Sequence, residues 1–244
     1  MMGLRAVLFD LFHTLTGPEN ERSDLPWTSD VLGIDRGVWN ELLIARSRWR
    51  LTGEETDPYT IVRTLAHEID PTIPGDRILA ATRCRIQRFR DSLTRIPPQN
   101  IQALHAIRAS GLRTAVISNA DAMEVAAWPA SPLAALFDVE VFSCVAGCVK
   151  PERAIYERCL HALKVRADEA VFVGDGGANE LVGAKEVGMA TVFVSGVMAT
   201  LSPDRVAARR SACDHHIERI PELLELLGLT SPGADVAGGR ESGL

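Results

Sequence analysis

Carboxylates, a hydroxyl and an amine stand at the ends of short apolar runs in this sequence, and together they are the groups that phosphoryl transfer needs. The four residues are Asp10 at the end of the run 5–10, Ser118 at the end of 114–118, Lys150 in the segment after 139–142, and Asp175 directly after 170–174. An aspartate can attack phosphorus and form an aspartyl phosphate. Carboxylates are ligands for Mg²⁺, and a hydroxyl and an ammonium group can hold phosphate oxygens and offset charge in the transition state.

The apolar runs themselves predict the elements that position these groups. With a further run at 190–194, they are typical of buried parallel strands. Helical patterns separate most of them, at 100–110, 152–163 and 177–187. Strands that alternate with helices predict an α/β fold with a parallel sheet covered on both faces. Ligands bind beyond the carboxyl ends of such strands, so we expect the four groups to meet in one crevice.

Residues 17–97 have a different character. They contain no buried-strand run, and helical patterns occur near 36–50, 58–69 and 75–93, before Pro97-Pro98 closes the segment. We predict a helical cap at 17–97, inserted into a core made of 1–16 and 98–229. The tail at 230–244 lacks the apolar content needed for packing, which predicts disorder.

Four motifs in a fixed order give this chain a resemblance to a known family. The motifs are Asp10-Leu-Phe12-His13-Thr14-Leu15, then Ile117-Ser118-Asn119, then Val149-Lys150-Pro151-Glu152, and last Gly174-Asp175-Gly-Gly-Ala-Asn179-Glu180 followed by Gly183. They resemble the four motifs of the haloacid dehalogenase-like hydrolase superfamily. The resemblance implies a doubly wound, Rossmann-like core with a helical cap inserted after the first motif, which matches the helical segment at 17–97.

The resemblance also implies roles for individual residues. Asp10 is the expected nucleophile, and Mg²⁺ is the expected cofactor, held by Asp10, Asp175 and the backbone carbonyl of Phe12. Ser118, Thr14 and Lys150 are expected to position the phosphoryl group.

Three further residues have open roles. Glu180 stands where relatives commonly have Asp, and it could bind metal directly, bind it through water, or accept hydrogen bonds from backbone amides. Asn119 and Asn179 could touch substrate or shape their loops.

Phe12 is the departure from the family pattern that matters most. Relatives have a second Asp at this position, which protonates the leaving group and later activates water. Losing general acid–base help typically costs about 10²–10⁴-fold in rate. A phosphatase could tolerate Phe12 with slower chemistry, with His13 as a substitute acid, or with a leaving group that needs no proton, as in an acyl phosphate.

Two alternatives to a phosphatase stay open. A 2-haloacid dehalogenase has an aromatic residue at the Phe12 position, but those relatives use no metal and resemble Ser-Ser-Asn where this chain has Gly174-Asp175. The chain could also be a binding or regulatory protein that lost efficient turnover, although such a protein has little use for the nucleophile. A phosphonatase-like Schiff base is disfavoured, because residues 1–149 contain no lysine.

Composition limits the setting in which this chain works. It has 244 residues and a net charge of −6, which argues against nucleic acid or an anionic membrane as the main partner and leaves a small phosphorylated molecule as the expected one. Neither a signal peptide nor a run of about 20 apolar residues is visible, which predicts a cytoplasmic protein. The five cysteines fit no zinc spacing. Arg46, Arg48 and Arg50 could contact a substrate anion, although a solvated helix face is the expectation for each. The sequence leaves the oligomeric state and the substrate open.

Overall fold

The structure of this protein is a computed structural model that describes residues 3–18 and 23–229. The predicted disordered tail, 230–244, lies outside the described residues.

The centre of the fold is a parallel sheet of six strands, as the sequence predicts apart from its last member. The strands are β1 (Ala6–Phe9), β2 (Arg113–Ser118), β3 (Val139–Phe142), β4 (Ala170–Gly174), β5 (Ala190–Val194) and β6 (His215–Ile217). Their order is β3-β2-β1-β4-β5-β6, and every neighbouring pair is parallel. The first strand is therefore central, with Phe9 paired to Val116 on one side and Val173 on the other.

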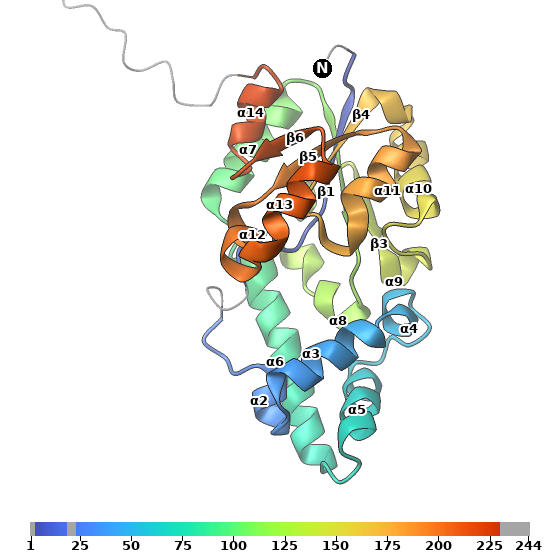
Figure 1. Ribbon diagram of the computed structural model, residues 1–244, viewed down its shortest axis with the longest axis vertical. Helices are drawn as coiled ribbons and strands as arrows, with labels where there is room; N and C mark the ends of the chain where they lie inside the picture. The colour runs from blue at the N-terminus through green and yellow to red at the C-terminus, as the bar shows by residue number, and fades with distance from the viewer. Residues whose placement is uncertain (1–2, 19–22, 230–244) are drawn as a thin grey trace, which may run out of the picture.

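Helices cover both faces of this sheet. The helices in this part of the chain are α7 (Pro98–Ala109), α8 (Ala122–Val125), α9 (Ser143–Ala146), α10 (Arg153–Leu163), α11 (Glu180–Val187), α12 (Gly196–Leu201), α13 (Pro203–Ala212) and α14 (Glu222–Leu226), with 3₁₀ turns η1 (Trp128–Ala130), η2 (Ala134–Leu136), η3 (Ala167–Glu169) and η4 (Gly177–Asn179). Successive residues of a strand point to opposite faces. Val7 and Phe9 accordingly pack with the α7 and α14 side chains, whereas Ala6 and Leu8 pack with those of α10 and α11. Figure 1 shows these two helix pairs on either side of the sheet.

A second group of helices lies between β1 and the rest of the sheet in sequence. It consists of α2 (Thr28–Leu32), α3 (Arg36–Ala45), α4 (Arg48–Leu51), α5 (Pro58–Ile69) and α6 (Gly75–Thr94). We call residues 28–94 the helical insertion. Its hydrophobic core includes the buried Trp39 and is joined by Met123 of α8. The insertion stands at the end of the molecule away from the N-terminus (Figure 1).

Among residues 3–18 and 23–229, no helix combines the length and the apolar character that a bilayer crossing needs.

Candidate active site

Three of the predicted site residues lie at the carboxyl end of the sheet because their strands are neighbours. Asp10 directly follows β1, Ser118 ends β2, and Asp175 directly follows β4. Since β1 lies between β2 and β4, these residues meet at one edge, and all three are buried. The expectation that parallel strands bring these motifs together agrees with this arrangement.

The turn after β1 arranges the residues around Asp10. His13 has a φ of 63°, in the left-handed region that turns the chain back. The His13 amide donates to Thr16 Oγ1 at 3.1 Å, and the Leu15 amide donates to the Leu11 carbonyl at 2.9 Å. The tight turn brings Thr14 Oγ1 within 2.9 Å of Asp10 Oδ2, to which it donates a hydrogen bond. The first motif thus supplies both a carboxylate and the hydroxyl that orients it.

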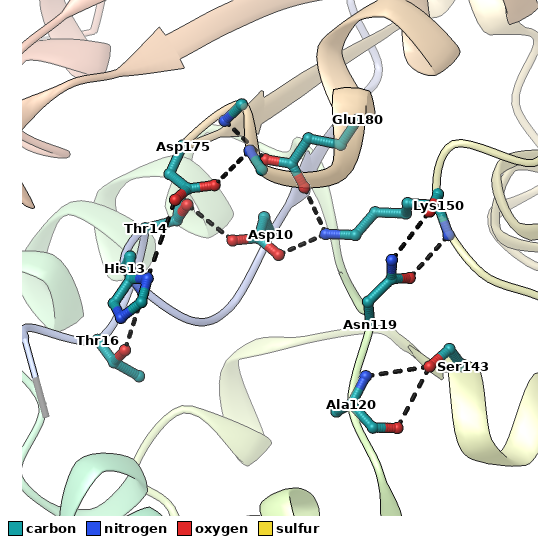
Figure 2. Close-up of polar contacts among 12 residues, drawn as sticks. Asp10, His13, Thr14, Thr16, Asn119, Ala120, Ser143, Lys150, Asp175 and Glu180 are labelled. Carbon is teal, nitrogen blue, oxygen red and sulfur yellow. Dashed lines mark hydrogen bonds and ion pairs between the residues drawn. The ribbon is translucent and has the colours of Figure 1, made fainter. Parts of the chain in front are cut away.

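Lys150 links the central carboxylates (Figure 2). Its buried ammonium group donates to Asp10 Oδ1 and, at 2.5 Å, to Glu180 Oε2. The Asn119 side chain holds the Lys150 backbone with two hydrogen bonds. Asn119 Nδ2 donates to the Lys150 carbonyl at 2.9 Å, and Asn119 Oδ1 accepts from the Lys150 backbone amide at 2.7 Å. Asn119 therefore shapes the loop that carries the lysine, which was one of its two expected roles.

The loop after β4 holds the other two carboxylates. Asp175 Oδ1 accepts from the Gly177 amide at 2.7 Å, and Glu180 Oε1 accepts from the Gly176 amide at 3.0 Å. A Cβ atom at position 174 would lie 2.2 Å from Glu180 Oε1, so Gly174 lets the glutamate reach this loop. Glu180 thus makes the backbone hydrogen bond that was one of its expected roles, and it adds an ion pair with Lys150.

Burial controls the electrostatics of this cluster. Loss of solvent raises the pKa of Asp10, and the Asp175 carboxylate adds to this effect, while Lys150 opposes it. Burial likewise raises the pKa of Glu180 well above its ordinary value. Burial alone would lower the pKa of Lys150, but attraction to the Asp10 and Glu180 carboxylates outweighs it and leaves the pKa above the ordinary value. The lysine is therefore charged, and it favours the ionised form of Asp10 that nucleophilic attack requires.

The donor set fits a divalent metal ion. One oxygen from each of Asp10, Asp175 and Glu180 lies within 4.8 Å of the others. These three carboxylates face two cationic side chains, Lys150 and Arg209. Three negative charges against two positive ones leave an excess of negative charge at a buried position, where it is costly without a further cation. Oxygen ligands with few carboxylates are what Mg²⁺ prefers.

The remaining predicted residues lie close by. His13 Nδ1 is 4.0 Å from Asp175 Oδ2, and the His13 side chain is partly exposed. The Phe12 ring packs edge-on against Phe89 of α6, with 5.2 Å between the ring centroids. Asn179 has a φ of 55° and precedes α11, consistent with shaping the loop.

Sequence reasoning missed Arg209 of α13. Its Nη1 donates to the Asp175 carbonyl at 2.6 Å and lies 3.4 Å from Asp175 Oδ2. The arginine belongs to none of the four motifs and reaches the loop from a helix that follows β5, so no local pattern announced it.

The structure corrects the expectation of a solvated helix face for Arg50. This residue is buried, and its Nη1 donates to Asp121 Oδ2 at 2.7 Å. Arg85 of α6 pairs with Glu124 of α8 beside it. Two arginines of the helical insertion are thus joined to two carboxylates that follow β2. Arg46 and Arg48 are more exposed, and each pairs with a glutamate.

Similarity to known proteins agrees with this geometry. The family model of haloacid dehalogenase-like hydrolases matches residues 4–188. The chain is 33% identical over 106 residues to bifunctional epoxide hydrolase 2 of Rattus norvegicus, which covers 41% of this chain but only 19% of that protein. It is 30% identical over 158 residues to ribulose-1,5-bisphosphate 5-phosphatase of Halopiger xanaduensis, covering 63% of this chain and 65% of that protein.

A solved structure has the same fold. L-2-haloacid dehalogenase from Xanthobacter autotrophicus, with chloropropionic acid covalently bound, superposes with a TM-score of 0.63 at 19% identity, covering 92% of this chain and 98% of that one. The four motifs, the parallel sheet and the family match lead to one conclusion: the chain belongs to the haloacid dehalogenase-like hydrolase family.

Proposed function

We propose that this protein is a Mg²⁺-dependent phosphatase that acts on a small phosphorylated metabolite through an aspartyl phosphate on Asp10. The observation that carries the proposal is the buried trio of carboxylates, Asp10, Asp175 and Glu180, with Lys150 bound to two of them. The similarity to a ribulose-1,5-bisphosphate 5-phosphatase supports the phosphatase class.

In the proposed reaction, the residues of this chain bind, orient and attack. Asp10 attacks phosphorus, which breaks the bond to the leaving oxygen, and water then attacks the aspartyl phosphate and releases phosphate. Thr14 holds the Asp10 carboxylate in place. The Lys150 ammonium and the Ser118 hydroxyl stabilise the phosphoryl oxygens. Asp10, Asp175 and the Phe12 carbonyl would hold Mg²⁺, which offsets negative charge on the transferring group.

Phe12 favours substrates with good leaving groups. A phenyl ring can neither donate a proton to the leaving oxygen nor activate water, and here it packs against Phe89. An acyl phosphate needs no such proton. We therefore expect acyl phosphates to be hydrolysed faster than alkyl phosphates by more than their intrinsic reactivity explains.

A 2-haloacid dehalogenase is the second candidate, because an aromatic residue at position 12 suits a halide leaving group, which also needs no proton. The buried carboxylate trio argues against it. A haloacid carries its own carboxylate, and placing it beside Asp175 and Glu180 without a metal ion would bring like charges together at a buried site.

One panel separates these functions. The purified protein is incubated with p-nitrophenyl phosphate, acetyl phosphate, sugar phosphates and L-2-chloropropionate, each with Mg²⁺ and with EDTA. Phosphate release that requires Mg²⁺ is the expected result. Chloride release that ignores EDTA would replace the phosphatase with the dehalogenase, and no turnover of any compound would favour a binding protein.

A further inference from the structure

A cavity of about 220 Å³ lies in the helical insertion, against α8 of the core. Its walls come from α2, α3 and α6 and include Trp27, Trp39, Phe89 and three arginines, Arg36, Arg85 and Arg88. One water takes about 30 Å³ of liquid volume, so the space is large enough for a small polyatomic ion. The predicted site residues do not line this cavity: His13 and Thr14 line a second one, and Asn179 lines a third.

Arg88 is the unusual residue of this cavity. It is only 3% exposed, and its guanidinium lies 3.8 Å from the Trp27 ring centroid. Its Nη1 donates to the Leu25 carbonyl, but Nη2 has no hydrogen-bond partner among the described residues. Among the residues that the structure describes, no carboxylate forms an ion pair with Arg88. Arginine stays charged in proteins, and a buried charge without a counter-ion is costly.

Ser29 gives a second, independent indication. It lines the same cavity at 1% exposure, and its Oγ also lacks a partner among residues 3–18 and 23–229. A hydroxyl and a guanidinium N–H are both donors that an oxyanion accepts.

The other charges at the cavity are already matched. Arg36 pairs with Asp30 at 3.3 Å, and Arg85 pairs with Glu124. Arg88 is therefore the excess positive charge, and the occupant that completes the site is negative.

We propose that this cavity binds the carboxylate or phosphate group of a small molecule through Arg88 and Ser29. The anion could be the second acidic group of the substrate or a free anion, and both supply the same chemistry. Phe89 lines the cavity and its ring contacts Phe12, two residues beyond Asp10, so this aromatic pair connects the cavity wall to the segment that carries the nucleophile. The substrate source rests on the proposed phosphatase function, whereas the anion site does not.

Tryptophan fluorescence tests the site without any turnover, because Trp27 and Trp39 are part of its walls. Inorganic phosphate is titrated in EDTA at constant ionic strength into the wild-type protein and into the Arg88→Met, Ser29→Ala and Arg46→Met variants. Arg46 is the matched control, an exposed arginine of the insertion paired with Glu68. We expect saturable binding by the wild type and by Arg46→Met. Arg88→Met should bind about 10-fold or more weakly, because it loses hydrogen bonds to a charged group.

Two outcomes would overturn the site: wild-type protein that shows no saturable phosphate binding, or an Arg88→Met protein that binds as tightly as wild type. If Arg88→Met fails to fold, Ser29→Ala decides in its place, with weaker binding expected and unchanged binding overturning the proposal.

Kinetics then identify the source of the anion. Hydrolysis of 3-phosphoglycerate is compared with that of glycerol 3-phosphate, which has a hydroxyl in place of the carboxylate. If the substrate supplies the anion, Arg88→Met lowers kcat/KM for 3-phosphoglycerate alone. If a free anion does, the variant loses phosphate binding and changes both substrates equally. Absence of hydrolysis would sink the proposed function but leave the phosphate titration decisive for the site.

Discussion

Replacing Lys150 by methionine tests the charge balance of the site most severely. Methionine keeps an unbranched apolar stem and removes the ammonium group that binds Asp10 and Glu180. Removing one partner of a buried ion pair typically costs about 3–5 kcal/mol, because the other charge stays buried without compensation. Here two carboxylates lose the same partner, with Asp175 nearby, so we expect a loss in that range.

Thermal unfolding in EDTA measures this loss. For a domain of about 150–250 residues, 1 kcal/mol corresponds to about 2–4 °C in Tm, so Lys150→Met should unfold roughly 6–20 °C below the wild type. Lys185→Met is the matched control: Lys185 is partly exposed and pairs with Asp214, and an exposed pair contributes at most about 1 kcal/mol.

Mg²⁺ provides the second half of the test. In the proposed site, Mg²⁺ and the Lys150 ammonium would share the Asp10 carboxylate. Adding Mg²⁺ should therefore raise the Tm of Lys150→Met more than that of the wild type. A Lys150→Met protein as stable in EDTA as the Lys185→Met control would refute the reasoning, and so would an equal Mg²⁺ effect on both proteins.

Three further predictions concern the surroundings of the site. Burial and the Asp121 carboxylate raise the pKa of Glu124 to about 7 from an ordinary 4.5. Between these two pH values the folded protein binds a proton that the unfolded chain does not, so the free energy of unfolding falls as the pH rises through this range. Glu124→Gln should remove this part of the pH dependence in urea unfolding, and a pH dependence equal to that of the wild type would contradict the prediction. Arg50→Met should lose up to about 3–5 kcal/mol, because the Asp121 carboxylate stays buried and keeps, among the described residues, only Arg85, 3.7 Å away, as a cationic partner. A loss no larger than that of Arg46→Met would contradict this. Asn119→Ala removes two hydrogen bonds to the Lys150 backbone and should cost about 1–3 kcal/mol and slow Mg²⁺-dependent phosphate release; wild-type rates would show that the loop holds Lys150 unaided.

The sheet was predictable because its inner strands are continuous apolar runs. The edge strand β6 was not predictable, because it has only three residues, His215, His216 and Ile217, and only Ile217 is buried. The pattern at 177–187 also placed a helix start too early. Ala178 and Asn179 adopt left-handed backbone angles, so α11 begins at Glu180, where its carboxylate reaches Gly176 and Lys150.

Some residues of the candidate site were predictable from the sequence, and others were not. Asp10 and Asp175 directly follow strands, so they could be placed from the carboxyl ends of the predicted parallel strands. The partners of these residues depend on distant segments: Arg209 reaches Asp175 from α13, and Arg50 reaches Asp121 from the helical insertion. Contacts of this kind follow from how helices pack on the finished sheet, and no local pattern of residue types encodes them.

Covalent phosphorylation of Asp10 is the most direct test of the proposed mechanism. The wild-type and Asp10→Asn proteins are mixed with acetyl phosphate and Mg²⁺, quenched rapidly in acid, digested, and mapped by mass spectrometry. The mechanism predicts a phosphoryl group on the peptide that contains Asp10, absent in EDTA and absent from Asp10→Asn, which should also lose phosphate release. Undiminished Mg²⁺-dependent phosphate release by Asp10→Asn would contradict the central claim.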